Sequence, residues 1–183
     1  MRHPFLEQSA EALAKRQIGT YRFEFPYMKA RKSRPDSPAV AEGAVREAVR
    51  CAARKVPGLP LIAGGKSFGG RMTSQAQASE PLPDVRGLAF FGFPLHAPGR
   101  PDISRAHHLD SVRVPLLFLQ GTRDEFAQLD LLQQVVQRLG KRATLHLIEE
   151  GDHSFKVPKR SGRTAAEVMD ELAEVIAQWA TGL

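Results

Sequence analysis

Apolar residues recur along the chain in two alternating patterns. In longer segments they return every three or four positions, and in residues 5–17 they place Phe5, Leu6 and Leu13 near one face. Shorter segments are continuously apolar, as expected of strands that are buried on both faces of a parallel sheet. The first pattern predicts helices at 5–17, 39–55, 67–79, 128–139 and 164–179. The second predicts strands at 59–63, 85–93, 114–120 and 143–148, and partial alternation predicts one more at 18–25.

Turn-forming residues separate these segments. Pro57-Gly58 ends the second predicted helix, and Gly140 caps the fourth. Residues 29–38 and 94–111 contain several prolines and predict loops. The alternation of helices and strands specifies an α/β fold with a mostly parallel sheet and helices on both faces. No repeat or linker divides the chain, so residues 1–183 are expected to form a single domain.

The strongest local motif is Gly65-Lys66-Ser67-Phe68-Gly69, between a predicted strand and a predicted helix. G-x-S-x-G at such a junction indicates a nucleophile elbow, a sharp turn that exposes the serine hydroxyl above the strand end. The helix N-terminus behind the serine favours developing negative charge. A phosphate-binding P-loop is excluded, because it needs glycine where this chain has Pro60. A glycine-rich turn without chemistry remains the alternative.

Two residues that complete a catalytic triad follow later strands. Asp124 comes directly after the strand at 114–120, and His153 directly after the strand at 143–148. The chain order serine, acid, histidine is the one that accompanies a G-x-S-x-G elbow in serine hydrolases. His153 would take the Ser67 proton, and Asp124 would hold the imidazole and stabilise its charged form. Three nearby acids remain rivals for the acid: Glu125, Glu150 and Asp152.

The other histidines give weaker signals. His96, His107 and His108 lie in the predicted loop after residue 93. They are expected to be solvated; the alternative is that they border the pocket. His146 lies within a predicted strand, where a structural role is expected. No H-x-x-x-H or Cys/His spacing predicts a metal site, and no cofactor is expected.

The composition excludes several classes of protein. The chain has 183 residues, of which 42% are hydrophobic and 25% charged, as in ordinary globular domains. No apolar run approaches the roughly 20 residues of a membrane helix, and no signal peptide follows Met1. The single cysteine, Cys51, excludes an intrachain disulfide. We therefore expect a cytoplasmic protein without a membrane partner.

The positive charge is concentrated in two predicted loops. The formal net charge is +6, and one basic group follows residue 28 while another follows His153. Both loops are expected at the carboxyl edge of the sheet, where ligands bind. One hypothesis is therefore an anionic small-molecule substrate bound by Arg31, Lys32 and Lys156; the alternative is solvated loops that maintain solubility. A nucleic-acid partner is not expected, because no aromatic stacking pattern accompanies the charge.

Three stretches together resemble the testis-expressed-protein-30/NSL-complex-type group of α/β hydrolases, which is related to the dienelactone hydrolases. They are YRFEFPYM at 21–28, GGKSFGGRM at 64–72 and GDHSF at 151–155. The resemblance implies the α/β-hydrolase fold and the triad positions Ser67, Asp124 and His153. It implies no substrate, and some relatives serve as noncatalytic subunits.

The chain departs from that group at its N-terminus. Members normally have an earlier strand beside the nucleophile strand, followed by a His-Gly-rich loop. That loop donates one of the two oxyanion-hole N–H groups, so the resemblance leaves only the N–H of Phe68 here. Loss of one such donor costs about 10²–10³ in rate. Three explanations remain: a start codon assigned too late, which we favour, a truncated gene, or a rearranged sheet.

Two functions follow from these observations. The leading prediction is a serine hydrolase that cleaves a small ester, thioester or amide through an acyl-enzyme. The short segment after residue 93 leaves little sequence for a lid, which favours small or exposed substrates. The alternative is a noncatalytic interaction module that keeps the fold, or an inactive truncated form.

Overall fold

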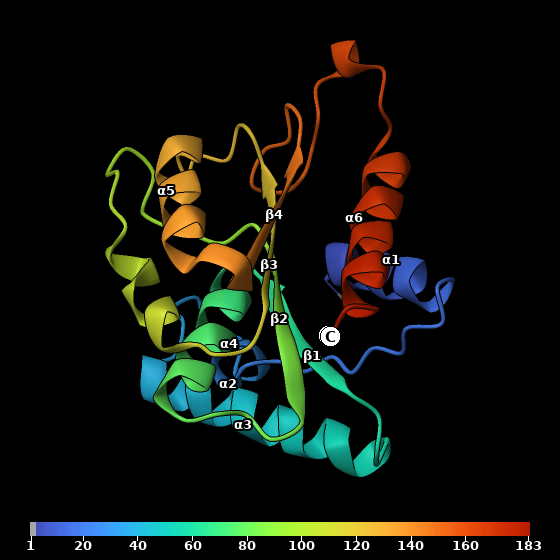
Figure 1. Ribbon diagram of the computed structural model, residues 1–183, viewed down its shortest axis with the longest axis vertical. Helices are drawn as coiled ribbons and strands as arrows, with labels where there is room; N and C mark the ends of the chain where they lie inside the picture. The colour runs from blue at the N-terminus through green and yellow to red at the C-terminus, as the bar shows by residue number, and fades with distance from the viewer. Residues whose placement is uncertain (1–2) are drawn as a thin grey trace.

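The computed structural model of the protein describes residues 3–183. Within them, one sheet contains the strands β1 (Leu61–Lys66), β2 (Val85–Phe91), β3 (Leu116–Gly121) and β4 (Ala143–Ile148), in that spatial order. Each neighbouring pair is parallel. Helices lie on both sides of the sheet (Figure 1). The predicted α/β arrangement, with a parallel sheet between helical layers, is confirmed.

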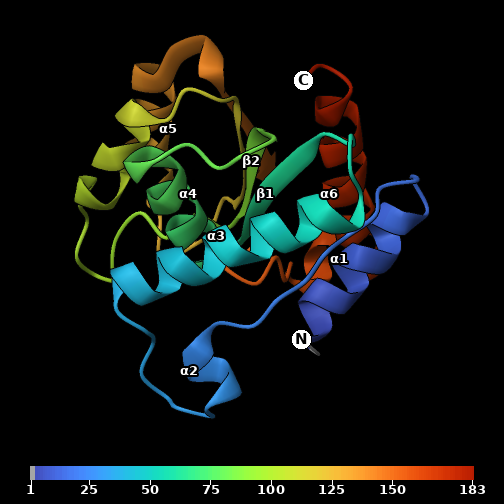
Figure 2. The same ribbon diagram turned by 90° about the horizontal axis from the view of Figure 1, so that it is seen from below.

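Two helical layers cover the sheet. One contains α1 (Pro4–Ala14) and α6 (Ala165–Ala180); the other contains α3 (Pro38–Lys55), α4 (Phe68–Ser79) and α5 (Leu129–Leu139). Figure 2 shows α1 against α6 and the long α3 on the other side of β1. Short elements complete the fold: α2 (Pro26–Lys29) and the 3₁₀ helices η1 (Ser104–Ser111), η2 (Gly140–Arg142) and η3 (Lys159–Ser161). No helix within residues 3–183 is long and apolar enough to cross a membrane.

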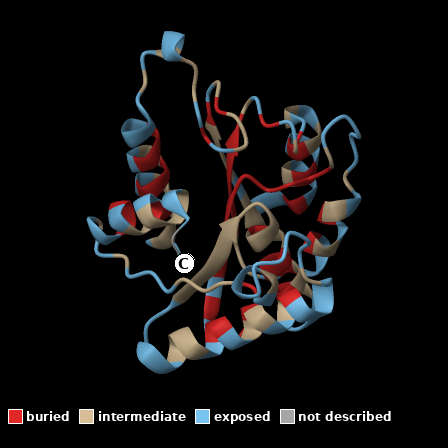
Figure 3. Cartoon of the chain, turned by 180° about the vertical axis from the view of Figure 1, so that it is seen from behind, coloured by how far each residue is buried: buried red, intermediate tan, exposed pale blue. Residues whose placement is uncertain are grey.

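Residues of the central strands alternate between two hydrophobic cores. In β3, Leu116 and Phe118 face the core under α3, α4 and α5, while Leu117 and Leu119 face the core under α1 and α6. These four side chains are 0% exposed. Figure 3 shows the buried residues along the middle of the sheet and the inner faces of the helices. Burial on both faces explains why these strands are continuous apolar runs in the sequence.

The edge strand β1 is more exposed than the central strands β2 and β3. All six of its residues are only partly buried, and within the described residues it pairs with β2 alone. It extends to Lys66, beyond the predicted range 59–63, and leads directly into Ser67. The family resemblance places another strand beside the nucleophile strand. Within residues 3–183, no strand pairs with that side of β1.

The predicted strand at 18–25 is wrong. The segment is extended but has no partner strand within the described residues. Phe25 is nevertheless buried, and its ring centroid lies 5.3 Å from that of Phe68 on α4. The alternating aromatic residues therefore pack the segment against a helix, and their period of two does not reflect pairing in the sheet.

The loop after β2 is more ordered than predicted, because it folds back over α4 and α5. His96 is 3% exposed; its Nδ1 lies 2.9 Å from the Ala97 carbonyl, and its Nε2 accepts the Gln128 N–H at 2.9 Å. His108 on η1 is partly buried, and its Nε2 lies 2.8 Å from Ser74 Oγ on α4. The expectation of solvated side chains is wrong for these two histidines, since both are at least partly buried and hydrogen-bond to other groups of the fold. His107 is exposed, as expected.

The burial of His108 makes the stability of the fold depend on pH. Burial, and then the Arg71 charge, lower the pKa of His108 from 6.5 to about 4, against weaker opposing effects of the Arg105 carbonyl and Asp110. The unfolded chain therefore binds a proton on this residue at a pH where the folded chain does not. The free energy of unfolding consequently falls as pH drops from about 6.5 to about 4, while at higher pH this residue adds no pH dependence.

We expect His108→Gln to flatten this part of the stability profile, because glutamine can keep a polar contact with Ser74 but does not titrate. The measurement is urea unfolding at several pH values between 4 and 7. His107→Gln, on the exposed neighbouring residue, is the control and should leave the slope unchanged. Equal slopes for His108→Gln and wild type would contradict the burial of a neutral His108.

Candidate active site

Ser67 occupies a sharp turn between β1 and α4. Its backbone angles are φ 50° and ψ −117°, a conformation that non-glycine residues seldom adopt. Hydrogen bonds hold this turn on both sides: Ser67 N–H donates to the Phe91 carbonyl at 3.0 Å, and the Arg71 N–H donates to the Ser67 carbonyl at 3.1 Å. The junction therefore has the geometry of a nucleophile elbow.

The closest approach of strand and helix occurs at Gly70, one position outside the G-x-S-x-G motif. A Cβ on Gly70 would lie 2.7 Å from the Gly65 carbonyl oxygen, which is too close for any side chain. At Gly65 and Gly69 the nearest atoms would be 3.4 and 3.8 Å away. The sequence signal for this contact is the pair Gly69-Gly70 after Phe68. The G-x-S-x-G motif ends at Gly69 and does not include it.

The three predicted triad residues are joined in one chain of hydrogen bonds. His153 Nε2 lies 2.8 Å from Ser67 Oγ, and His153 Nδ1 lies 2.7 Å from Asp124 Oδ2. Asp124 is 4% exposed, and its Oδ1 accepts the Phe126 N–H at 2.8 Å. The Asp124 carboxylate accepts a hydrogen bond from Nδ1–H, which leaves Nε2 as the acceptor for the serine hydroxyl. The arrangement can activate an oxygen nucleophile.

The rival acids have other partners. Asp152 Oδ1 accepts two backbone N–H groups of the residues that follow it, at 2.7 and 2.9 Å, which is a turn-forming contact. Glu150 pairs with Arg160, and Glu125 is exposed. Of the four acids, Asp124 is the one that contacts the histidine.

Gln120, which no sequence motif indicates, supports the acid. It is 0% exposed on β3, and its side-chain Nε2 donates to Asp124 Oδ2. Its Oε1 accepts the Phe93 N–H at 2.9 Å, so one amide links the acid to the end of β2. In the sequence, the signal for this role is a single polar residue at the end of an otherwise apolar strand.

Lys66, at the first variable position of G-x-S-x-G, contacts the loop that carries His153. Its Nζ donates to the His153 carbonyl at 2.6 Å and lies 4.8 Å from the ring centroid of Phe5 and 5.4 Å from that of Phe155. Burial lowers the pKa of this ammonium group, and nearby carboxylates oppose the effect. The contact joins the elbow directly to the loop that carries the proposed base.

A shallow cavity of about 320 Å³ lies beside the histidine. The Phe126 ring forms part of it, with its centroid 4.4 Å from that of the His153 ring. The cavity is lined by Arg123, Glu125, Phe126, Asp152, His153 and Ser154. It is open and carries charges of both signs, so it is suited to a small polar group.

The predicted oxyanion donor, Phe68, lies next to Ser67 at the start of a helix. Phe68 is the first residue of α4, where backbone N–H groups have no acceptor within the helix. Its ring packs against those of Phe25 and Tyr27, with centroids 5.3 and 6.1 Å away. These contacts fix the residue next to the serine.

The three residues predicted to bind an anion lie at the surface. Arg31, Lys32 and Lys156 are all exposed. Within the described residues, no side-chain hydrogen bond joins any of them to the three triad positions. No group of three side chains in residues 3–183 has the composition and spacing to hold a metal ion.

Comparison with known proteins places this geometry in a family. The sequence matches the family model described as alpha/beta hydrolase domain over residues 1–181. An α/β serine hydrolase homologue from Coxiella burnetii superposes with a TM-score of 0.71 at 19% identity, covering 97% of this chain and 76% of that one. A lidless α/β serine hydrolase from Xanthomonas campestris gives a TM-score of 0.67 at 20% identity, covering 98% and 75%.

The esterase domain of a Rhodothermus marinus protein is a third similar structure. It gives a TM-score of 0.66 at 15% identity, covering 96% of this chain and 79% of that one. At these identities the likeness establishes the fold, and the prediction of a shortened α/β-hydrolase fold is confirmed. The chain therefore belongs to the α/β-hydrolase family whose sequence model spans residues 1–181.

Proposed function

We propose that this chain is a serine hydrolase that cleaves small esters, thioesters or amides through an acyl-enzyme. The observation that carries the proposal is the hydrogen-bond chain from Ser67 through His153 to Asp124, at 2.8 and 2.7 Å. A binding module has no use for a serine in strained backbone hydrogen-bonded to a histidine with a buried acid behind it.

In the proposed reaction, Ser67 Oγ attacks the substrate carbonyl carbon while its proton passes to His153 Nε2. Asp124 stabilises the imidazolium that forms, and the Phe68 N–H donates to the oxyanion. When the tetrahedral intermediate collapses, the bond to the leaving group breaks and the leaving group takes the proton from Nε2. Water, activated by the neutral histidine, then attacks the acyl-enzyme and releases the acid.

The surroundings of the histidine support a small leaving group. The leaving group receives its proton from His153, which lines the open cavity of about 320 Å³. The similar structure from Xanthomonas campestris is described as lacking a lid, and the one from Rhodothermus marinus as an esterase domain. Both descriptions support ester cleavage at an exposed site.

Further parts of the proposal rest on the sequence. The stretches at 21–28, 64–72 and 151–155 support a relationship to the testis-expressed-protein-30/NSL-complex-type group and to dienelactone hydrolases. The exposed side chains of Arg31, Lys32 and Lys156 would attract an anionic substrate from solution without holding it in place. A cytoplasmic location is part of the same proposal.

The first test is labelling with a fluorophosphonate, read by intact mass. We expect one adduct on the wild type and none on Ser67→Ala, because the probe reacts with an activated serine. Ser154→Ala is a matched control, since Ser154 is an exposed serine next to His153, and it should still be labelled. No adduct on folded protein would contradict the proposal and favour a noncatalytic interaction module.

A second test addresses the amide that supports the acid. Gln120→Met preserves the side-chain volume but removes the hydrogen bond to Asp124, and we expect kcat to fall about tenfold with little change in KM. Gln77→Met is the control: Gln77 is also buried and accepts the Leu82 N–H at 2.8 Å, but on α4. Hydrolysis of p-nitrophenyl acetate and thermal unfolding are measured for both variants. If both lose stability and neither loses kcat, Gln120 has only a structural role.

A further inference from the structure

The loop that carries His153 is anchored to β1 by the residue next to the proposed nucleophile. Lys66 Nζ donates to the His153 carbonyl at 2.6 Å, and Lys66 directly precedes Ser67 in the chain. One stretch of backbone therefore carries both the nucleophile and the anchor of the base. Within residues 3–183 the ammonium group forms no ion pair, so the carbonyl is its hydrogen-bond acceptor. A charged donor makes such a bond roughly twice as strong as a neutral one.

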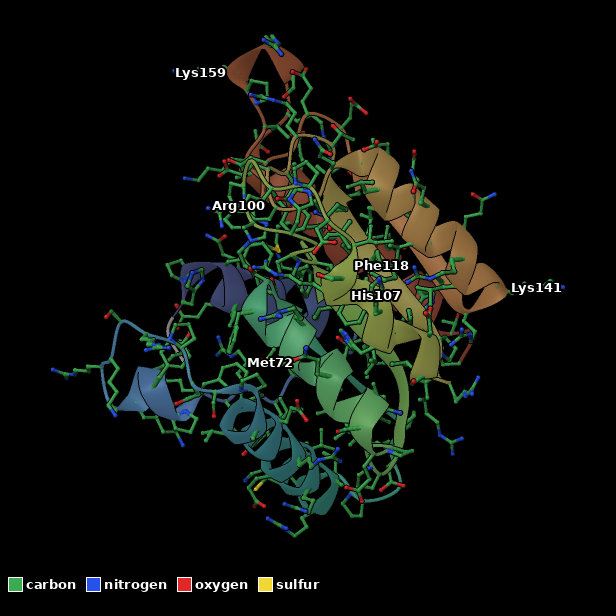
Figure 4. All side chains as sticks on the ribbon, turned by 90° about the vertical axis from the view of Figure 1, so that its left-hand side faces the viewer. Met72, Arg100, His107, Phe118, Lys141 and Lys159 are labelled. Atoms are coloured by element: carbon green, nitrogen blue, oxygen red, sulfur yellow. The ribbon has the colours of Figure 1, made fainter. Side chains whose placement is uncertain are left out.

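The turn around His153 is closed by its own hydrogen bonds. Asp152 Oδ1 accepts the Ser154 and Lys156 N–H groups at 2.7 and 2.9 Å, and the Asp152 N–H donates to the Lys156 carbonyl at 3.0 Å. Figure 4 shows Lys159, on η3, at the outer end of the loop that follows, and Figure 1 shows η3 projecting beyond α5 and α6. The inner side of the turn is therefore where contacts with the sheet can fix its position.

Two aromatic rings complete the contact on this inner side. The Lys66 ammonium group lies 4.8 Å from the ring centroid of Phe5 on α1 and 5.4 Å from that of Phe155, within the range of a cation–π interaction. The two rings stack with centroids 5.7 Å apart, and Phe155 is 4% exposed although its φ is 61°. The buried Phe155 ring and the His153 carbonyl thus fix the turn at two points.

We propose that Lys66 is a positioning residue, which holds the His153 backbone so that Nε2 faces Ser67 Oγ. The rings of Phe5 and Phe155 keep the ammonium group in place for this contact. Lys66 touches none of the reacting atoms and acts through the backbone of the base. The inference rests on the proposed function, since positioning matters for catalysis only if His153 takes the Ser67 proton.

The kinetic test compares Lys66→Met, which removes the charge and the donor, with Lys66→Arg, which keeps both. We expect Lys66→Met to lower kcat for p-nitrophenyl acetate about tenfold with KM within about twofold, and Lys66→Arg to recover most of the loss. Lys159→Met alters an exposed lysine of the same loop and should change neither constant. An unchanged kcat in Lys66→Met, or an equal loss in Lys66→Arg, would overturn the assignment.

The charge of Lys66 makes this positioning depend on pH. Burial lowers the pKa of the ammonium group, against the opposing effects of Asp124 and Asp152, and the aromatic rings around it do not titrate. The group therefore loses its charge as pH rises through a value below the ordinary 10.5, and kcat should fall with it. Lys66→Arg should abolish this alkaline fall, because a guanidinium group stays charged there. The same fall in Lys66→Arg as in wild type would contradict the proposal.

Hydrogen exchange of the free protein separates this inference from the proposed function. We expect the backbone amides of residues 151–157 to exchange about tenfold faster in Lys66→Met than in wild type, and those of β3 to be unchanged. If fluorophosphonate labelling of the wild type fails but this difference is found, Lys66 holds the turn and the proposed catalysis fails. If labelling succeeds and neither exchange nor kcat depends on Lys66, the inference fails alone.

Discussion

The common direction of the strands is the constraint on which the rest of this structure depends. Because β1, β3 and β4 are parallel, the residues that follow them emerge at one edge of the sheet. Ser67, Asp124 and His153 are far apart in the sequence but meet there at hydrogen-bond distance. The topology of the sheet thus brings the three side chains together, and the chemistry of the side chains then determines what the site can do.

The arrangement is fixed by contacts that surround the three residues. Gln120 and the Phe126 N–H hold the acid, and Lys66 holds the backbone of the histidine loop. The strand and the helix on either side of the strained Ser67 backbone pack closely at Gly70, where a Cβ would lie 2.7 Å from the Gly65 carbonyl oxygen. Because these contacts already hold the groups in place, the hydrogen-bond donors of the site need not rearrange during a reaction.

Much of this could be predicted from the sequence. The strands β2, β3 and β4 are apolar runs because both of their faces are buried, and the elbow is marked by its glycines. The prediction of a strand at 18–25 is wrong, because an extended segment packed on a helix can show the same alternation as a strand. Gln120 and Lys66 were missed, because their roles depend on contacts with Asp124 and His153, which no local pattern encodes.

The central claim is that the elbow presents Ser67 to an electrophile, with the Phe68 N–H positioned for the oxyanion. A crystal structure of the fluorophosphonate-treated protein tests both parts at once. The account predicts phosphorus bonded to Ser67 Oγ and the phosphoryl oxygen within hydrogen-bond distance of the Phe68 nitrogen. A phosphoryl oxygen directed away from that nitrogen, or a Ser67 with relaxed negative φ and its hydroxyl turned from His153, would contradict it.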